Sequence, residues 1–213
     1  MNAMLTQVNK LPKRTIIVDV DDTLLKSSEE VIRQLNRKNG TEKTLDDMWD
    51  YCYASIDPKA TQDDIIGIYA SDEFFDNVRF NDGALDFLQK YQDLFHIVLV
   101  TYGCERNLEQ KTKWLLKQKE LYHLDQVDMI GVLMSIQNKR DIFLPNVYMA
   151  IDDKAAHLEE HNAPAKVLLR NYHNTSYNQV PVNSDWYVAN DFYDIINMID
   201  FDLMLQEEGI YIG

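Results

Sequence analysis

The stretch TIIVDVDDTLL, residues 15–25, decides the fold, because an apolar run rich in β-branched residues ends in three carboxylates within four positions. Residues 16–18 form a short apolar segment typical of a strand that is buried on both faces. Asp19 therefore lies at the carboxyl end of a predicted central strand. In open α/β sheets this edge is where ligands bind.

Asp19 and Asp21 are expected to point to the same side if the chain stays extended, since side chains alternate along a strand. Two carboxylates so close together raise each other's pKa unless a cation lies between them. A divalent metal would keep Asp19 ionised, and ligands that are all oxygen favour Mg²⁺. The alternative interpretation is a strand that ends in a solvated acidic turn.

This pattern, an apolar strand followed by D-x-D-x-T-L, resembles the first motif of the haloacid dehalogenase-like (HAD) phosphohydrolase superfamily. The resemblance implies three later features in fixed order: an apolar strand ending in Ser or Thr, a Lys, and an apolar strand ending in paired acids. All three are present in the sequence, as Thr101 after residues 97–100, Lys139, and Asp152-Asp153 after residues 147–151.

The first motif supplies the covalent chemistry that the resemblance implies. Asp19 is expected to attack phosphorus and form an aspartyl-phosphate. Asp21 is expected to protonate the leaving oxygen and then to activate the hydrolytic water. The family also implies that the backbone carbonyl of Asp21, rather than its carboxylate, contacts Mg²⁺.

The later motifs supply charge and phosphate binding. Thr101 and the backbone N–H groups of Tyr102 and Gly103 are expected to bind phosphate oxygens. Lys139 is expected to offset negative charge on the nucleophile and the phosphoryl group, with Arg140 as the alternative cation. Of the paired acids, Asp153 is expected to bind the metal directly, and Asp152 is expected to orient the residues around the metal without binding it.

The order of strand and helix patterns predicts an α/β fold, a Rossmann-like parallel sheet with helices on both faces. Residues 28–79 contain helical patterns without a clear strand, including a capping-box pattern at residues 27–30 and helix starts at Thr44 and Thr61. The resemblance implies that this insertion is a small helical cap over the active site. The core would then comprise residues 1–27 and 80–213.

The substrate is indicated by a closer resemblance to the 5′(3′)-deoxyribonucleotidase branch, whose members dephosphorylate nucleoside monophosphates. It is carried by the cap position, the paired acids and three further features, which are Phe74-Phe75 before an Asn-Asp-Gly-Ala turn, Tyr177-Asn178, and Trp186. Asp22 departs from the pattern, since many relatives have Gly there. An aromatic cluster in the insertion could stack on a base or form cap core; its members are Trp49, Tyr51 and Tyr53.

Length and composition narrow the function classes. The chain has 213 residues, enough for one α/β domain with an insertion, and no apolar run long enough to span a bilayer. A net charge of −14 argues against nucleic-acid backbones and anionic membranes as partners and leaves a small phosphorylated substrate. Two cysteines and the absence of an apolar secretory segment in residues 1–12 favour a reducing, cytoplasmic location.

Of three alternatives to the 5′-nucleotidase hypothesis, one is excluded and two remain open. A phosphorylation-accepting receiver domain has its paired acids first and its Lys last, so the order of motifs here excludes it. A phosphatase acting on the 3′ ends of polynucleotides is disfavoured by the net negative charge and the absence of basic runs. A non-catalytic, phosphate-binding regulatory protein on the same scaffold is disfavoured because each catalytic position is filled.

Overall fold

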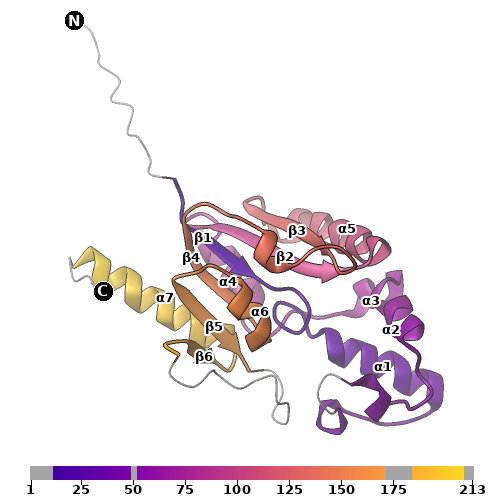
Figure 1. Ribbon diagram of the computed structural model, residues 1–213. Coiled ribbons are helices and arrows are strands. Elements are labelled where there is room, and N and C mark those ends of the chain that lie inside the picture. Colours follow the sequence, from indigo (N-terminus) through magenta and orange to yellow (C-terminus); the bar gives the residue numbers. More distant parts are fainter. Residues whose placement is uncertain (1–11, 49–51, 171–183, 209–213) are drawn as a thin grey trace, which may run out of the picture.

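The computed structural model describes residues 12–48, 52–170 and 184–208, and six parallel strands form one sheet (Figure 1). The strands are β1 (Thr15–Val18), β2 (His96–Gly103), β3 (Val127–Leu133), β4 (Val147–Asp152), β5 (Ala165–Leu169) and β6 (Tyr187–Ala189). Their order across the sheet is β3-β2-β1-β4-β5-β6, so β1 is central, as its buried apolar run predicts. β2 and β4 pair with its two edges.

Helices connect the strands. The α-helices are α1 (Ser27–Asn39), α2 (Gln62–Tyr69), α3 (Asp72–Asn77), α4 (Ala84–Tyr91), α5 (Glu105–Tyr122), α6 (Ala155–Glu160) and α7 (Phe192–Glu207). Three single 3₁₀ turns are η1 (Leu45–Asp47), η2 (Tyr53–Ser55) and η3 (Lys139–Asp141). Within the described ranges, none of the helices has the length and apolar character needed to cross a bilayer.

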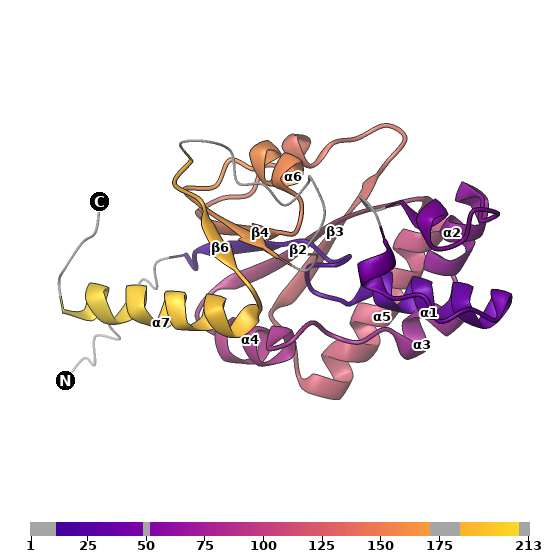
Figure 2. The ribbon, with the colours of Figure 1, turned by 90° about the horizontal axis from the view of Figure 1, so that it is seen from below.

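Side-chain alternation along β1 divides the core between the two faces of the sheet. Ile16 and Val18 pack into the larger apolar cluster, to which α4, α5 and α7 contribute, whereas Ile17 packs into a smaller cluster with Leu158 of α6. In Figure 2, α6 lies on one side of the sheet and α4, α5 and α7 on the other. The predicted Rossmann-like fold with helices on both faces is confirmed.

The helices α1 to α3 are inserted between β1 and α4, beyond the carboxyl ends of the strands (Figure 1). Val31, Leu35 and Phe74 of this insertion belong to the same buried cluster as Ile16 and Leu99 of the sheet. The inserted helices therefore rest on apolar surface that is continuous with the core, which fixes them beside the strand ends.

Helix signals in the insertion are confirmed in part, since Thr44 begins only the 3₁₀ turn η1 and not the helix predicted there. Helix α1 ends at Gly40, whose φ of 65° suits a residue without a side chain, and Thr61 caps α2 through a reciprocal bond with Asp64. The capping box predicted at residues 27–30 does not form. Instead, the backbone N–H and hydroxyl of Ser28 both donate to the Asp22 carboxylate, at 2.6 and 2.5 Å.

Candidate active site

Two neighbouring strands, β1 and β4, bring three acidic residues to one edge of the sheet. Asp19 follows β1, and its backbone N–H still pairs with the Ile151 carbonyl of β4 at 2.9 Å. Asp152 ends β4 and Asp153 follows it. Oxygens of these three carboxylates lie within 4.8 Å of one another, and all three residues are buried.

Lys139 is the cation inside this acidic cluster. Its Nζ donates to Asp19 Oδ1 at 2.6 Å and to Asp152 Oδ2 at 2.7 Å, and its side chain is fully buried. Burial alone would lower the pKa of Lys139, but the charges of Asp152 and Asp19 outweigh it and raise the pKa above its usual value. The ammonium therefore stays charged at neutral pH. Arg140, the alternative cation, is exposed and pairs with Glu160 at 3.4 Å.

One buried ammonium does not neutralise three carboxylates. Burial raises the pKa of Asp153 well above its usual value, and the charge of Asp152 adds to the effect. Burial also raises the pKa of Asp19, although Lys139 opposes it. The pKa of Asp152 is lowered, because Lys139 overcomes the cost of its burial. A compact set of hard oxygen donors with excess negative charge suits a divalent cation such as Mg²⁺.

Asp152 and Asp153 differ in their surroundings. Asp152 accepts from Lys139 and from the backbone N–H of Lys154 at 2.9 Å, and it does not line the adjoining cavity. Asp153 lines the cavity, and Thr23 of the first motif both accepts from its backbone N–H at 2.9 Å and donates to its carboxylate at 3.1 Å. This arrangement supports the predicted division between a metal-binding Asp153 and a supporting Asp152.

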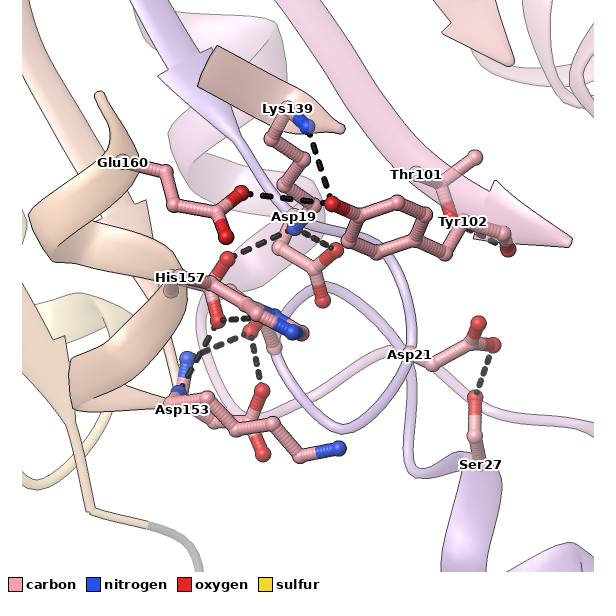
Figure 3. A network of polar contacts seen from close by, with 12 residues as sticks. Asp19, Asp21, Ser27, Thr101, Tyr102, Lys139, Asp153, His157 and Glu160 are labelled. Carbon is pink, nitrogen blue, oxygen red and sulfur yellow. Dashed lines mark hydrogen bonds and ion pairs between the residues drawn. The ribbon is translucent and has the colours of Figure 1, made fainter. Parts of the chain in front are cut away.

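Asp21 does not join the cluster, contrary to the expectation for an extended chain. The chain turns after β1, with Leu24 N–H bonded to the Asp19 carbonyl at 3.3 Å, and the Asp21 side chain points toward Ser27 (Figure 3). Its Oδ1 accepts from Ser27 Oγ at 3.0 Å and its Oδ2 from Lys111 Nζ at 2.5 Å. Asp19 and Asp21 nevertheless line the same cavity.

Lys111 was not predicted from the sequence. A signal was present, because it lies on the buried face of α5 between residues at helical spacing; the buried residues of that helix are Asn107, Lys111, Trp114, Leu115 and Gln118. Burial of a lysine at such a position destabilises the folded state unless its ammonium finds hydrogen-bond acceptors. Because the apolar periodicity of residues 105–121 is loose, the buried face of this helix could not be identified from the sequence.

The second motif reaches the cavity through Tyr102 and Gly103, while Thr101 itself is fully buried behind them. Thr101 is buried in β2, and Tyr102 and Gly103 follow it at the cavity wall. A Cβ atom at Gly103 would lie 2.3 Å from Asn107 Oδ1, so a larger residue would displace Asn107, whose amide donates to the Tyr69 carbonyl at 2.6 Å. The Tyr102 hydroxyl donates to Glu160 at 3.2 Å and accepts from Lys139 N–H at 2.9 Å (Figure 3), so it holds the loop that carries the lysine.

Asp22 connects the first motif to the insertion. Its backbone has a φ of 60°, the left-handed region in which glycine is the least strained residue. Ser28, which donates to its carboxylate, is also bonded to the Tyr53 hydroxyl at 2.8 Å, and Tyr53 to the Tyr69 hydroxyl at 2.7 Å. The Asp in place of Gly thus anchors a hydrogen-bonded chain that reaches α2.

The cavity has a volume of about 670 Å³ and lies between the acidic cluster and the insertion. Tyr53, Ile65 and Tyr69 contribute from the insertion, together with Asp19 and Asp21 from the core. Of the predicted aromatic cluster, Tyr53 therefore faces the site, packed edge-to-face against Tyr69. Trp49 and Tyr51 lie outside the described residues.

Comparisons with known proteins agree with this geometry. Residues 13–200 match the family model described as 5′ nucleotidase, deoxy (Pyrimidine), cytosolic type C protein. A search of curated proteins finds no match. Among solved structures, the chain is similar to haloacid dehalogenase-like protein SP0104 from Streptococcus pneumoniae, with 15% identity and a TM-score of 0.56 over 88% of this chain and 98% of that one.

Two further solved structures share the fold. The HAD-hydrolase YfnB from Bacillus subtilis, bound to magnesium, has 15% identity and a TM-score of 0.53 over 89% of this chain and 100% of that chain. A HAD-superfamily hydrolase of subfamily IA from Geobacter sulfurreducens has 11% identity and a TM-score of 0.53, with 88% and 96% covered.

Proposed function

Because the chain belongs to the cytosolic type C family of 5′-deoxynucleotidases, a family of HAD-type phosphatases, we propose that it is a Mg²⁺-dependent hydrolase of (deoxy)nucleoside 5′-monophosphates. The observation that carries this proposal is the buried Asp19 carboxylate, which lines the cavity, accepts from Lys139 and lies beside two further acids. The family's description as cytosolic supports the expectation of a cytoplasmic enzyme.

In the first half-reaction, a carboxylate oxygen of Asp19 attacks phosphorus, and the bond between phosphorus and the nucleoside oxygen breaks. The Lys139 ammonium, 2.6 Å from Asp19, lies where it offsets charge on the nucleophile and on the phosphoryl group. Asp21 gives a proton to the departing nucleoside oxygen. Thr101 and the backbone N–H groups of the second motif hold the phosphoryl oxygens.

In the second half-reaction, water attacks the phosphorus of the aspartyl-phosphate. Asp21, now a carboxylate, takes the proton of that water, and the bond between phosphorus and the Asp19 oxygen breaks. Inorganic phosphate leaves and Asp19 is restored. The same side chain therefore serves first as acid and then as base.

Magnesium would be held by the Asp19 and Asp153 carboxylates and the backbone carbonyl of Asp21, with Asp152 holding Lys139 beside them. When bound, it would supply positive charge to the phosphoryl oxygens and so favour attack by an anionic carboxylate. YfnB, which shares the fold, is a magnesium-bound protein, and this supports the choice of ion.

Phosphate release from a panel of nucleotides, sugar phosphates and an aryl phosphate tests the function, and excess chelator tests the metal. Activity should vanish with chelator and return with Mg²⁺, because without a cation the cluster carries more negative charge than Lys139 offsets. Full turnover by the metal-free protein would contradict the scheme. Equal rates on all monoesters would leave a phosphatase without nucleotide selectivity.

The raised pKa values of Asp19 and Asp153 make the stability of the metal-free protein depend on pH. Each carboxyl binds its proton more tightly in the folded state, so the metal-free protein loses stability as pH rises from the ordinary value near 3.8 through the raised pKa values. Magnesium replaces those protons and should therefore raise the melting temperature more at pH 8 than at pH 5. Thermal unfolding with and without Mg²⁺ at both pH values measures the difference.

Substrate selectivity is proposed to reside in the insertion, residues 28–79, acting as a cap over the strand ends. The motif residues are expected to contact only the phosphoryl group and the metal, and so selectivity between monoesters needs other residues of the cavity wall. Tyr53, Ile65 and Tyr69 give the cavity a wall of apolar and aromatic surface that suits a nucleobase. Trp49 and Tyr51 remain candidates for the same role.

Tyr53 offers a direct test of base stacking. Tyr53→Ala should cost about 1–3 kcal/mol in kcat/KM on a deoxynucleoside monophosphate, by analogy with base stacking elsewhere, and should largely spare a small aryl phosphate. Tyr53→Phe, the matched control, keeps the ring and removes the hydroxyl that bonds Ser28 and Tyr69. Equal losses on both substrates with Tyr53→Ala would show that the ring is cap core.

A further inference from the structure

Lys111 is a buried lysine on a helix that lies outside the four motifs. It lies in the middle of α5, on the face that packs against the sheet, and its side chain is fully buried. A buried ammonium without partners would cost several kcal/mol. Its retention at this position therefore requires acceptors that compensate for the loss of water.

Three acceptors surround its Nζ. They are Asp21 Oδ2 at 2.5 Å, Thr101 Oγ1 at 2.7 Å and the Tyr102 carbonyl at 2.8 Å. An ammonium has three N–H groups, so these three bonds use all of its donors. Lys111 has none left for a substrate, and any effect on the reaction must pass through the residues that it holds.

The effect on Asp21 is to fix the direction of the carboxylate. Lys111 of α5 holds one oxygen and Ser27 of α1 holds the other, at 3.0 Å. The side chain is thereby kept at the cavity wall, 29% exposed, and outside the cluster of Asp19, Asp152 and Asp153. An acid that must reach a leaving oxygen is useful only if it is held within hydrogen-bond range of it.

The effect on Thr101 is to fix the polarity of its hydroxyl. An ammonium can only donate, so the Thr101 oxygen accepts from Lys111 and its own proton must point to another acceptor. That proton is directed to the Tyr102 carbonyl at 3.4 Å, a long hydrogen bond. A phosphoryl oxygen would be a stronger acceptor, because it carries negative charge.

We propose that Lys111 is a positioning residue for phosphoryl transfer, which holds the acid Asp21 in place and turns the Thr101 hydroxyl into a donor for phosphate. This assignment rests on the proposed phosphatase function. It predicts that loss of Lys111 impairs protonation of the leaving group, so the damage grows as the leaving group becomes more basic.

The test compares kcat/KM, which reports the first half-reaction, on aryl phosphates of similar size whose leaving groups differ in basicity. With Lys111→Met, the loss should be about 10²-fold on phenyl phosphate and under about tenfold on 4-nitrophenyl phosphate, since a nitrophenolate leaves with little help from an acid. Asp21→Asn should show the same dependence. The double variant should lose little more than either single one, because the two residues act as a unit.

Lys113→Met is the matched control, since Lys113 lies on the same helix but is exposed and pairs with Glu109; its rates should equal those of the wild type. If Lys111→Met does not fold, Lys111→Gln, which keeps a donor, decides the question by the same comparison. Equal losses on both aryl phosphates would overturn the assignment and leave the proposed function intact. A wild-type protein that hydrolyses neither ester would overturn the proposed function and the assignment with it.

Discussion

Asp19→Asn is expected to lower kcat/KM by about 10⁴-fold or more on every phosphate monoester, as happens when the nucleophile of a covalent mechanism is removed. The physical reason is that an amide oxygen lacks the negative charge needed to attack phosphorus. The loss should not depend on the leaving group, in contrast to the loss with Lys111→Met. Single-turnover assays with a nucleotide and with 4-nitrophenyl phosphate measure it.

The fold of Asp19→Asn should be preserved. The amide is nearly isosteric, its oxygen can still accept from Lys139, and it removes a buried charge whose pKa is raised. We therefore expect the metal-free variant to unfold at a denaturant concentration no lower than that of the wild type. Asp93→Asn, a change at an exposed turn, is the control and should alter neither activity nor stability. Retention of a tenth of the wild-type rate would show that Asp19 is not the nucleophile.

Lys139→Met is expected to have the largest effect on stability. It removes the ammonium between Asp19 and Asp152, the buried cation that offsets the charge of the three carboxylates. Removing one partner of a buried ion pair typically costs about 3–5 kcal/mol in the free energy of unfolding, because the remaining charge is uncompensated. Urea unfolding of the metal-free protein measures the loss, and Mg²⁺ should recover part of it.

The activity of Lys139→Met should also fall, by about 10²–10³-fold, since preorganised charge near the phosphoryl group is lost. Arg140→Met is the matched control for the neighbouring cation, which is exposed and only weakly paired with Glu160. Its free energy of unfolding should change by less than about 0.5 kcal/mol. If Arg140→Met lowered activity and stability more than Lys139→Met, then Arg140 would be the cation that acts beside the nucleophile.

Asp22 connects the core to the inserted helices by hydrogen bonds. Its carboxylate accepts hydrogen bonds from the backbone N–H and the hydroxyl of Ser28. The Ser28 hydroxyl is also bonded to the Tyr53 hydroxyl, which is bonded to that of Tyr69. A glycine at this position would relieve the positive φ but would leave Ser28 without that acceptor. Asp22 therefore combines a positive φ with a hydrogen-bonded connection between the first motif and the inserted helices.

The sequence by itself determined the sheet and the order of the candidate catalytic residues along the chain. Strands with continuous apolar runs, such as residues 16–18, can be recognised because burial on both faces leaves no room for polar side chains. Three of these runs, residues 16–18, 97–100 and 147–151, are followed by Asp19, Thr101 and Asp152, and parallel strands bring those ends to one edge. Local pattern placed Asp19 at the end of a strand, and the resemblance to the HAD motifs predicted that Thr101 and the paired acids lie beside it.

Only the tertiary structure decided how the polar side chains pair. The chain turns after β1, so the alternation that places Asp19 did not predict the direction of Asp21. Lys111 is 90 residues from Asp21 in the sequence, and Lys139 is 120 residues from Asp19. Whether such lysines are solvated or buried depends on how α5 and the loop before β4 pack on the sheet. Helical spacing can mark a buried position, but the acceptors that make a buried ammonium tolerable come from other elements, and only packing brings them within hydrogen-bond distance.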